Sequence, residues 1–276
     1  MRLLTGPFEI DGAPRASSIA RPLAEVAAAA VLGAGAGLAA DAGFGAASGM
    51  GHALASASVH AGFLGAGWVV ALDGQPGWRG PTLRGAGALA LASLAAGVST
   101  AGALVYLLVP LVLSGDAARA RARLAGMGWR APRETRATLI GAAAGTFLGL
   151  HLLIAASQML GYAVSIPDRG RYVAALAYDV GANGLTAEWF FRGAIFSALW
   201  RRWSFWPAAA ASTVLALVRY LLDPALPKAI EMMAGATFYL SLLSFACCAL
   251  RAWSGSLVPG YFATVAFFAA YRMLLV

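Results

Sequence analysis

The chain has 276 residues, of which 60% are hydrophobic and only 12% are charged, and its mean hydropathy is +0.73. No ordinary soluble domain needs so apolar a composition, so we expect an integral membrane protein. The net charge of +8 comes mostly from arginines in loops. In loops, arginines set membrane topology and contact anionic lipid, so we expect membrane lipid as a partner and no nucleic acid.

Apolar segments follow one another along the chain, and several exceed the roughly 18 residues that a helix needs to cross a bilayer. We expect an all-α, polytopic membrane protein of about eight transmembrane helices, in which abundant Gly and Ala allow close helix packing. The expected spans cover residues 22–40, 50–72, 86–113, 137–162, 172–200, 205–222, 229–250 and 257–275.

The segment 116–136 is strongly basic, and it suggests both a topology and a division of the chain. Its charged residues are Arg119, Arg121, Arg123, Arg130, Arg133 and Arg136 against only Asp116 and Glu134. By the positive-inside rule this loop is cytoplasmic, and the pair Arg201 and Arg202 indicates the same side. The turn at 223–228 is then expected outside. We divide the chain into N-terminal transmembrane helices with the basic loop (1–136) and a membrane core (137–276).

Glu188 and Arg192 lie inside the fifth apolar segment, in the run GLTAEWFFRGA that begins at Gly184. On an α-helix, residues four apart share a face and can pair. Each charge at the bilayer centre costs about 2.5–3.5 kcal/mol on insertion scales, so we expect both side chains to face the protein interior. The structural interpretation is an ion pair that neutralises both, and the functional alternative is that Glu188 acts as a base.

Three landmarks follow one another in the second half of the chain. They are WFFRG at 189–193, the helix STVLALVRY at 212–220, and GSLVPG at 255–260. In this order they resemble the CPBP family of membrane endopeptidases, which comprises the CAAX prenyl protease type II and bacteriocin-processing (Abi) enzymes. The resemblance covers about residues 137–275. It implies a CAAX-protease-like helical bundle, a multi-pass protein of a bacterial inner membrane, and glutamic-type proteolysis without a metal or other cofactor.

The family pattern is Glu-Glu-x-x-x-Arg on one helix, Phe-x-x-x-His on the next, and His-x-x-x-Asn or Asp on the last. A carboxylate activates water, histidines position it, and an amide steadies the oxyanion. Aligned with this chain, the four catalytic positions read Ala187, Arg219, Thr264 and Phe268, while Glu188 and Arg192 keep the second Glu and the Arg. Alanine cannot activate water and phenylalanine cannot donate to an oxyanion. The resemblance therefore implies a degenerate active site.

The leading hypothesis is an inactive relative that binds a transmembrane or lipid-modified peptide, or an active protein partner. One alternative is an active endopeptidase rebuilt around Glu188, with Arg219 stabilising an oxyanion and His151 assisting; another is a small-molecule or lipid carrier. Arg219 also needs an anionic partner in the membrane. Glu188 is the first choice, with Asp179 and Asp223 as others. The structural alternative for His151 is a hydrogen bond to a neighbouring helix.

Aromatic residues gather toward the inner end of the fifth segment. They are Trp189, Phe190, Phe191, Trp200, Trp203 and Trp206. With Arg201 and Arg202 beside them, they are typical of a belt at the membrane–water interface.

Overall fold

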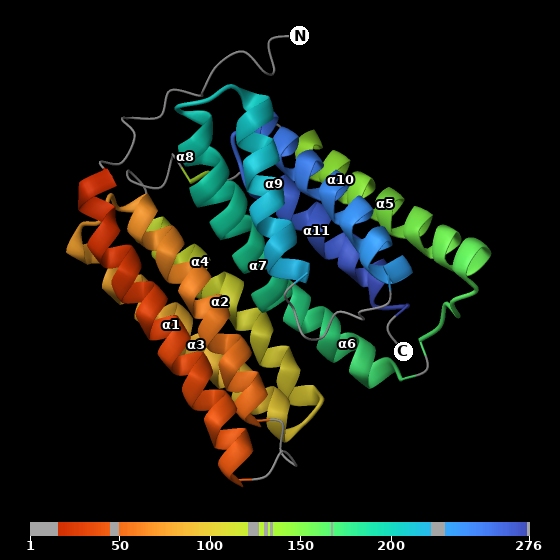
Figure 1. Ribbon diagram of the computed structural model, residues 1–276, viewed down its shortest axis with the longest axis horizontal. Helices are drawn as coiled ribbons and strands as arrows, with labels where there is room; N and C mark the ends of the chain where they lie inside the picture. The colour runs from red at the N-terminus through yellow and green to blue at the C-terminus, as the bar shows by residue number, and fades with distance from the viewer. Residues whose placement is uncertain are drawn as a thin grey trace. The chain divides into compact units, whose positions relative to one another are not determined.

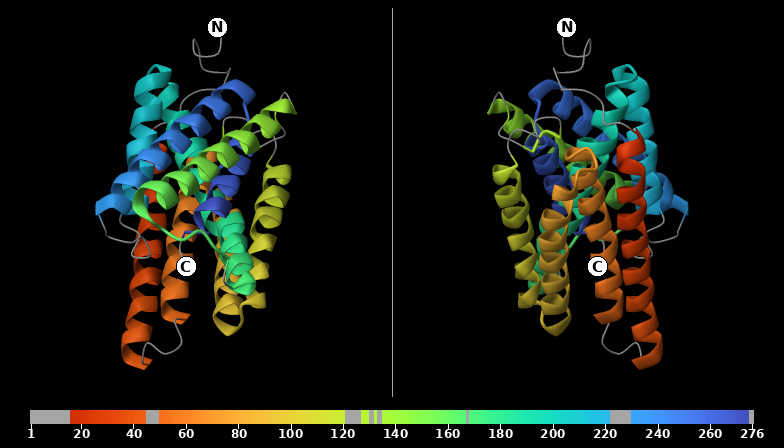
Figure 2. Two further views of the ribbon diagram at one scale, coloured as in Figure 1. Left: turned by 90° about the vertical axis from the view of Figure 1, so that its right-hand side faces the viewer. Right: turned by 90° about the vertical axis from the view of Figure 1, so that its left-hand side faces the viewer.

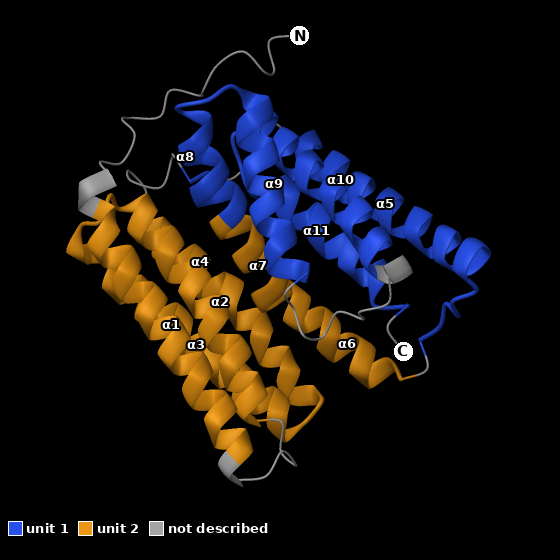
Figure 3. Cartoon of the chain, viewed as in Figure 1, with its two compact units in different colours: residues 1–11, 126–167, 191–276 blue, residues 12–125, 168–190 orange. Residues whose placement is uncertain are grey.

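The computed structural model describes residues 16–44, 50–120, 127–129, 132, 135–166, 168–221 and 230–274. Within these ranges every regular element is helical (Figure 1). The chain divides into two compact units (Figure 3). Unit 1 comprises residues 1–11, 126–167 and 191–276, and unit 2 comprises residues 12–125 and 168–190.

Within the described ranges, five helices are long and apolar enough to cross a membrane. They are Ile19–Ala42, Met50–Ala71, Ala101–Arg119, Arg136–Leu160 and Met233–Ser254. Phe205–Leu221 and Val258–Tyr271 are apolar but shorter. The predicted all-α membrane architecture is confirmed, whereas the number of eight spans stays a prediction.

In unit 2, α1 (Ala16–Phe44) and α2 (Met50–Ala71) lie side by side, and α3 (Arg79–Val98) packs on α2 (Figures 1 and 2). Glycines allow the close approach of α1 and α2, because a Cβ at Gly37 would lie 2.6 Å from the carbonyl oxygen of Gly51. The Asp41 carboxylate of α1 accepts the backbone N–H groups of Gly51 (2.8 Å) and His52 (2.7 Å). Asp41 therefore caps the N-terminus of α2.

The prediction of one span over residues 86–113 is wrong. Helix α3 ends at Val98, the backbone of Ser99 is extended, and the chain then continues through a 3₁₀ helix, η3 (Ala101–Leu107), into α4 (Leu108–Arg119). The carbonyl and the hydroxyl of Ser99 both accept the N–H of Gly102, at 2.9 and 3.0 Å. A Cβ at Gly102 would lie 2.0 Å from the carbonyl oxygen of Ala95, so the turn requires glycine there.

The fifth predicted span is helical throughout, but it is not a uniform α-helix. It runs through α6 (Arg169–Tyr178), η4 (Asp179–Asn183), α7 (Gly184–Ala187), η5 (Glu188–Phe196) and α8 (Ser197–Trp200). Both η4 and η5 are π-helical. Such segments are rare and are often found at functional sites.

In unit 1, α5 (Arg136–Leu160) and α11 (Val258–Tyr271) pack closely, and α10 (Ile230–Ser254) contacts both of them and α9 (Phe205–Leu221). A Cβ at Gly141 would lie 2.2 Å from the carbonyl oxygen of Pro259, and one at Gly145 would lie 2.0 Å from that of Ala263. Small residues spaced by four thus let the two backbones touch, as in many membrane helix pairs.

The remaining predicted spans are confirmed as helices, namely α1, α2, α5, α9, α10 and α11. The predicted outer turn at 223–228, including Asp223, lies outside the described residues, as do residues 121–126, 130–131 and 133–134 of the basic segment 116–136. The division at residue 136 stays a prediction.

Candidate functional site

Glu188 and Arg192 both lie in η5, and both are buried, with 1% and 3% of their surface exposed. The prediction that neither faces outward is consistent with this burial. The expected stacking of residues four apart assumed an α-helix, whereas a π-helix joins residues five apart. The ion pair between Glu188 and Arg192 therefore stays a prediction.

Two serines supply hydrogen-bond donors to the backbone of η5. The Ser212 hydroxyl of α9 donates to the carbonyl of Phe191 at 2.8 Å, and the Ser197 hydroxyl donates to the carbonyl of Arg192 at 3.0 Å. Both serines are buried. Because buried carbonyls need partners, these serines stabilise the wider turn at the motif arginine.

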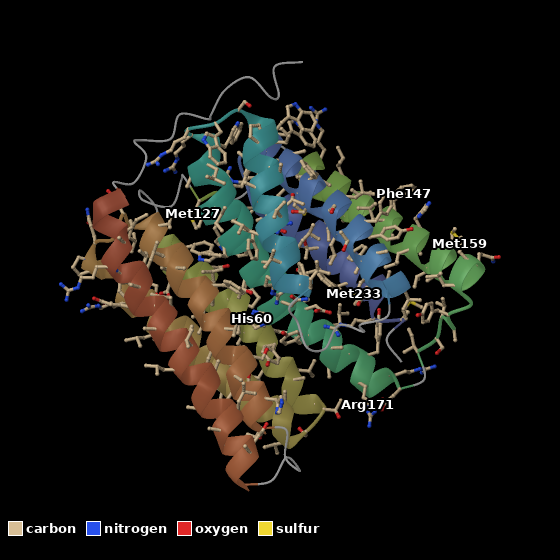
Figure 4. The ribbon with its side chains drawn as sticks, in the orientation of Figure 1. His60, Met127, Phe147, Met159, Arg171 and Met233 are labelled. Carbon is tan, nitrogen blue, oxygen red and sulfur yellow. The ribbon has the colours of Figure 1, made fainter. Side chains whose placement is uncertain are left out.

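In unit 2 a polar chain joins α2 to the helix that carries the motif. His60 of α2, labelled in Figure 4, has one ring nitrogen 2.7 Å from the Thr186 hydroxyl and the other 2.7 Å from the Tyr178 hydroxyl. The Tyr178 hydroxyl also lies 3.3 Å from the Ser56 hydroxyl. A neutral imidazole can donate to one of these hydroxyls and accept from the other. Thr186 directly precedes Ala187, so the chain holds the motif backbone against α2.

His60 lies before the motif region in the chain and is not among the candidate residues of the sequence analysis. Its contacts with Thr186 and Tyr178 span 126 and 118 residues, and a single sequence carries no signal of a pairing over such a separation. The only hint was a histidine inside an apolar segment, since a buried imidazole needs hydrogen-bond partners.

A second buried contact lies just before Thr186 in the chain, where the Asn183 amide donates to the Asp179 carboxylate at 2.8 Å. Asp179 is completely buried, and Asn183 is 5% exposed. Both belong to η4. The buried acid therefore has at least one donor within its own helix.

The aromatic belt prediction is wrong for half of its members. Trp189, Phe191 and Trp200 are buried in the protein, whereas Trp203 and Trp206 are 49% and 63% exposed.

Trp189 packs against Gly67 of α2, where the absence of a side chain leaves room for the indole ring. Its indole N–H donates to the carbonyl of Leu64 at 3.1 Å, and a Cβ at Gly67 would lie 2.1 Å from the indole nitrogen. Phe190 stacks on Phe63 of the same helix, with ring centroids 5.0 Å apart. This segment thus packs into α2 instead of facing an interface.

In unit 1, Arg219 and Phe268, which occupy two of the catalytic positions of the family pattern, both contact the ring of Tyr220. The Arg219 guanidinium lies 4.4 Å from the ring centroid of Tyr220, and this ring lies 5.8 Å from that of Phe268. Phe268 is 4% exposed and belongs to an aromatic and aliphatic core. The arginine is thus half-buried over an aromatic face, which is a favourable place for a cation.

The third altered position, Thr264, is also buried, at 2% exposed. Its hydroxyl lies 3.6 Å from the thiol sulfur of Cys247, which lies 3.5 Å from the carbonyl oxygen of Gly260. These contacts join α10 to α11. Ala187 is 1% exposed. None of Ala187, Thr264 and Phe268 carries a group that gives or takes a proton near neutral pH.

His151 forms a hydrogen bond between helices. Its Nδ1 lies 2.6 Å from the Tyr239 hydroxyl, which joins α5 to α10. The expectation that His151 bonds a neighbouring helix is confirmed.

Residues 169–268 match the model of a protein family described as type II CAAX prenyl endopeptidase, Rce1-like. This segment is Rce1-like. The resemblance found in the sequence is thereby confirmed, and the chain is a membrane protein similar to the CPBP intramembrane proteases. The Rce1-like segment contains all six motif positions: Ala187, Glu188, Arg192, Arg219, Thr264 and Phe268. Comparisons with curated proteins and with solved structures gave no significant match.

Proposed function

We propose that this protein is a catalytically inactive relative of the CAAX prenyl endopeptidases that binds a lipid-modified or transmembrane peptide. The observation that carries the proposal is the identity of the four catalytic positions. Where the family pattern has a carboxylate, two imidazoles and an amide, this chain has Ala187, Arg219, Thr264 and Phe268.

The contacts of these side chains support the loss of activity. Phe268 contributes an aromatic ring to the core of unit 1, and Arg219 lies over the Tyr220 ring, which packs against Phe268 at a tilt. A hydrolase needs a base that takes a proton from water and donors that stabilise the oxyanion. Phenylalanine provides neither, and an arginine is always protonated in proteins.

A binding function follows from what the chain keeps. Residues 169–268 match the Rce1-like family model, and the chain keeps the second Glu and the Arg of the motif as Glu188 and Arg192, both of which are buried. Enzymes of the matched family act on prenylated peptides, so we expect a peptide with a prenyl group as occupant. We further propose that the protein lies in a bacterial inner membrane with the basic segment 116–136 in the cytoplasm, following the positive-inside rule.

The test is equilibrium binding of a fluorescent farnesylated peptide to the full chain in lipid nanodiscs, followed by anisotropy. The matched control is the same peptide without the farnesyl group. The proposal predicts saturable binding of the farnesylated peptide that unlabelled farnesylated peptide displaces. Equal affinity for both peptides, or no saturable binding, would argue against a substrate-like occupant.

The alternative is an active endopeptidase rebuilt around Glu188. It is favoured by the position of this buried acid at the start of a π-helical segment, a feature common at functional sites. In that case the protein would cleave the farnesylated peptide, and Glu188→Gln would abolish cleavage. Cleavage that persists in the Glu188→Gln variant would point to a contaminating protease.

A further inference from the structure

Unit 2 contains a cluster of two arginines and one acid that the proposed function does not use. Asp116, near the C-terminal end of α4, is only 2% exposed, whereas Arg84 of α3 and Arg119 of α4 are 52% and 75% exposed. Arg84 binds the carboxylate through Nε, at 2.9 and 3.1 Å, and through Nη2, at 2.8 Å. Arg119 binds it through Nη1 at 2.9 Å.

The charges in this cluster do not balance. A buried carboxylate needs one cation to be neutralised, and here two guanidinium groups bind the same carboxylate. One positive charge is left over near the end of the helices. The cluster therefore favours a further anion.

The geometry places the two guanidinium groups close together. Arg84 Nη2 and Arg119 Nη1 both bond to Oδ1 of Asp116, so these two nitrogens lie no more than about 5.7 Å apart, the two bond lengths combined. Nη1 of Arg84, and Nε and Nη2 of Arg119, take no part in the contacts with Asp116. Planar guanidinium groups bind phosphate oxygens through paired N–H groups.

The location of the cluster suggests the source of the phosphate. The arginines lie near the start of α3 and at the end of α4, at the entrance to the basic segment 116–136. The positive-inside rule places that segment in the cytoplasm, and the cytoplasmic leaflet is the anionic one. We propose that Arg84 and Arg119, held by Asp116, form a binding site for the headgroup phosphate of an anionic phospholipid.

A second cluster in unit 2 has the same charges but a looser geometry, and it provides a matched control. Arg21 and Arg79 pair with Glu25 through different carboxylate oxygens, at 3.1 and 3.0 Å. Glu25 is 37% exposed, and the arginines are 90% and 63% exposed. A carboxylate in water holds its partners less firmly, so this cluster is expected to attract anions without forming a site.

The test is titration of a short-chain phosphatidylglycerol into the full chain in neutral maltoside micelles, with Kd measured by thermophoresis. Arg84→Gln/Arg119→Gln is compared with Arg21→Gln/Arg79→Gln, which changes the net charge equally. A guanidinium that binds the phosphate directly through charge-assisted hydrogen bonds should contribute about tenfold, so the first double variant should bind roughly a hundredfold more weakly. The control should stay within about threefold of wild type.

Equal weakening by the two double variants would overturn the proposal, because it would show general attraction of anions. If Arg84→Gln/Arg119→Gln fails to fold, Arg84→Lys/Arg119→Lys replaces it. This variant keeps the charge but loses the paired N–H groups, so it should also bind more weakly; wild-type affinity in it would contradict a built site. Titration with inorganic phosphate distinguishes a lipid headgroup from free phosphate as the ligand, since a lipid site should prefer phosphatidylglycerol. Phosphate binding of equal strength would overturn the lipid assignment.

Discussion

Replacing His60 should destabilise the protein through the loss of two hydrogen bonds. His60 is 2% exposed and bonds Thr186 and Tyr178, both at 2.7 Å. We choose His60→Leu because an apolar residue of similar size leaves no large cavity. Interhelical hydrogen bonds within membranes contribute about 0.6 kcal/mol on average and up to about 1.7. Two such bonds predict a loss of about 1–3 kcal/mol, or a melting temperature lower by roughly 3–10 °C.

The assay is unfolding by dodecyl sulfate in mixed micelles, with scanning fluorimetry as a second readout. His151→Leu is the control, because that exposed imidazole makes one hydrogen bond, to Tyr239. The loss of stability in His151→Leu should be smaller than that in His60→Leu. A double-mutant cycle with Thr186→Val isolates the contact, for which we expect about 0.5–1.5 kcal/mol of coupling. Additive effects of His60→Leu and Thr186→Val would refute the idea that this bond holds the motif helix to α2.

Three further predictions concern unit 1, each measured by the same unfolding assay. Phe268→Asn should cost about 3 kcal/mol or more, because it removes a buried ring and places an amide in the aromatic core; unchanged stability would indicate a wet pocket at that position. Arg219→Ala should cost about 1 kcal/mol of stability through loss of the contact with Tyr220, and Arg219→Lys should cost less. Unchanged stability in Arg219→Ala would contradict a structural role for Arg219. Gly145→Ala should destabilise by about 1–3 kcal/mol, because its Cβ would meet a carbonyl of α11 at 2.0 Å. The control is Gly87→Ala in α3 of unit 2, which has nothing within 4 Å and should stabilise by up to about 1 kcal/mol; equal effects would contradict close packing of α5 on α11.

The sequence was sufficient to predict most helices, because long apolar runs have few other structures available in a membrane. The third predicted span failed at Ser99, inside the run GVSTAG that begins at Gly97. The length of an apolar run does not reveal a turn within it when the residues of the turn are small. A serine followed three residues later by glycine was the available signal, and the structure uses both in the hydrogen bonds from Gly102 to Ser99.

The site was predicted as a set of positions but not as a set of contacts. The motif spacing identified Arg219 and Phe268, yet nothing in the sequence indicated that Tyr220 would lie between them. The π-helical segment η5 receives a hydrogen bond from Ser212 of α9, and no local propensity encodes such a tertiary partner. The burial of Trp189 likewise depends on Gly67, which lies more than 120 residues earlier.

The central proposal is that the protein binds a prenylated peptide and leaves it intact. The most direct measurement is single-turnover hydrolysis, with the full chain in nanodiscs in excess over a farnesylated peptide and the peptide mass followed over a day. The account predicts intact peptide with wild type and with Glu188→Gln alike, under conditions where binding is saturated. A defined cleavage product that forms with wild type and disappears with Glu188→Gln would contradict it and assign catalysis to Glu188.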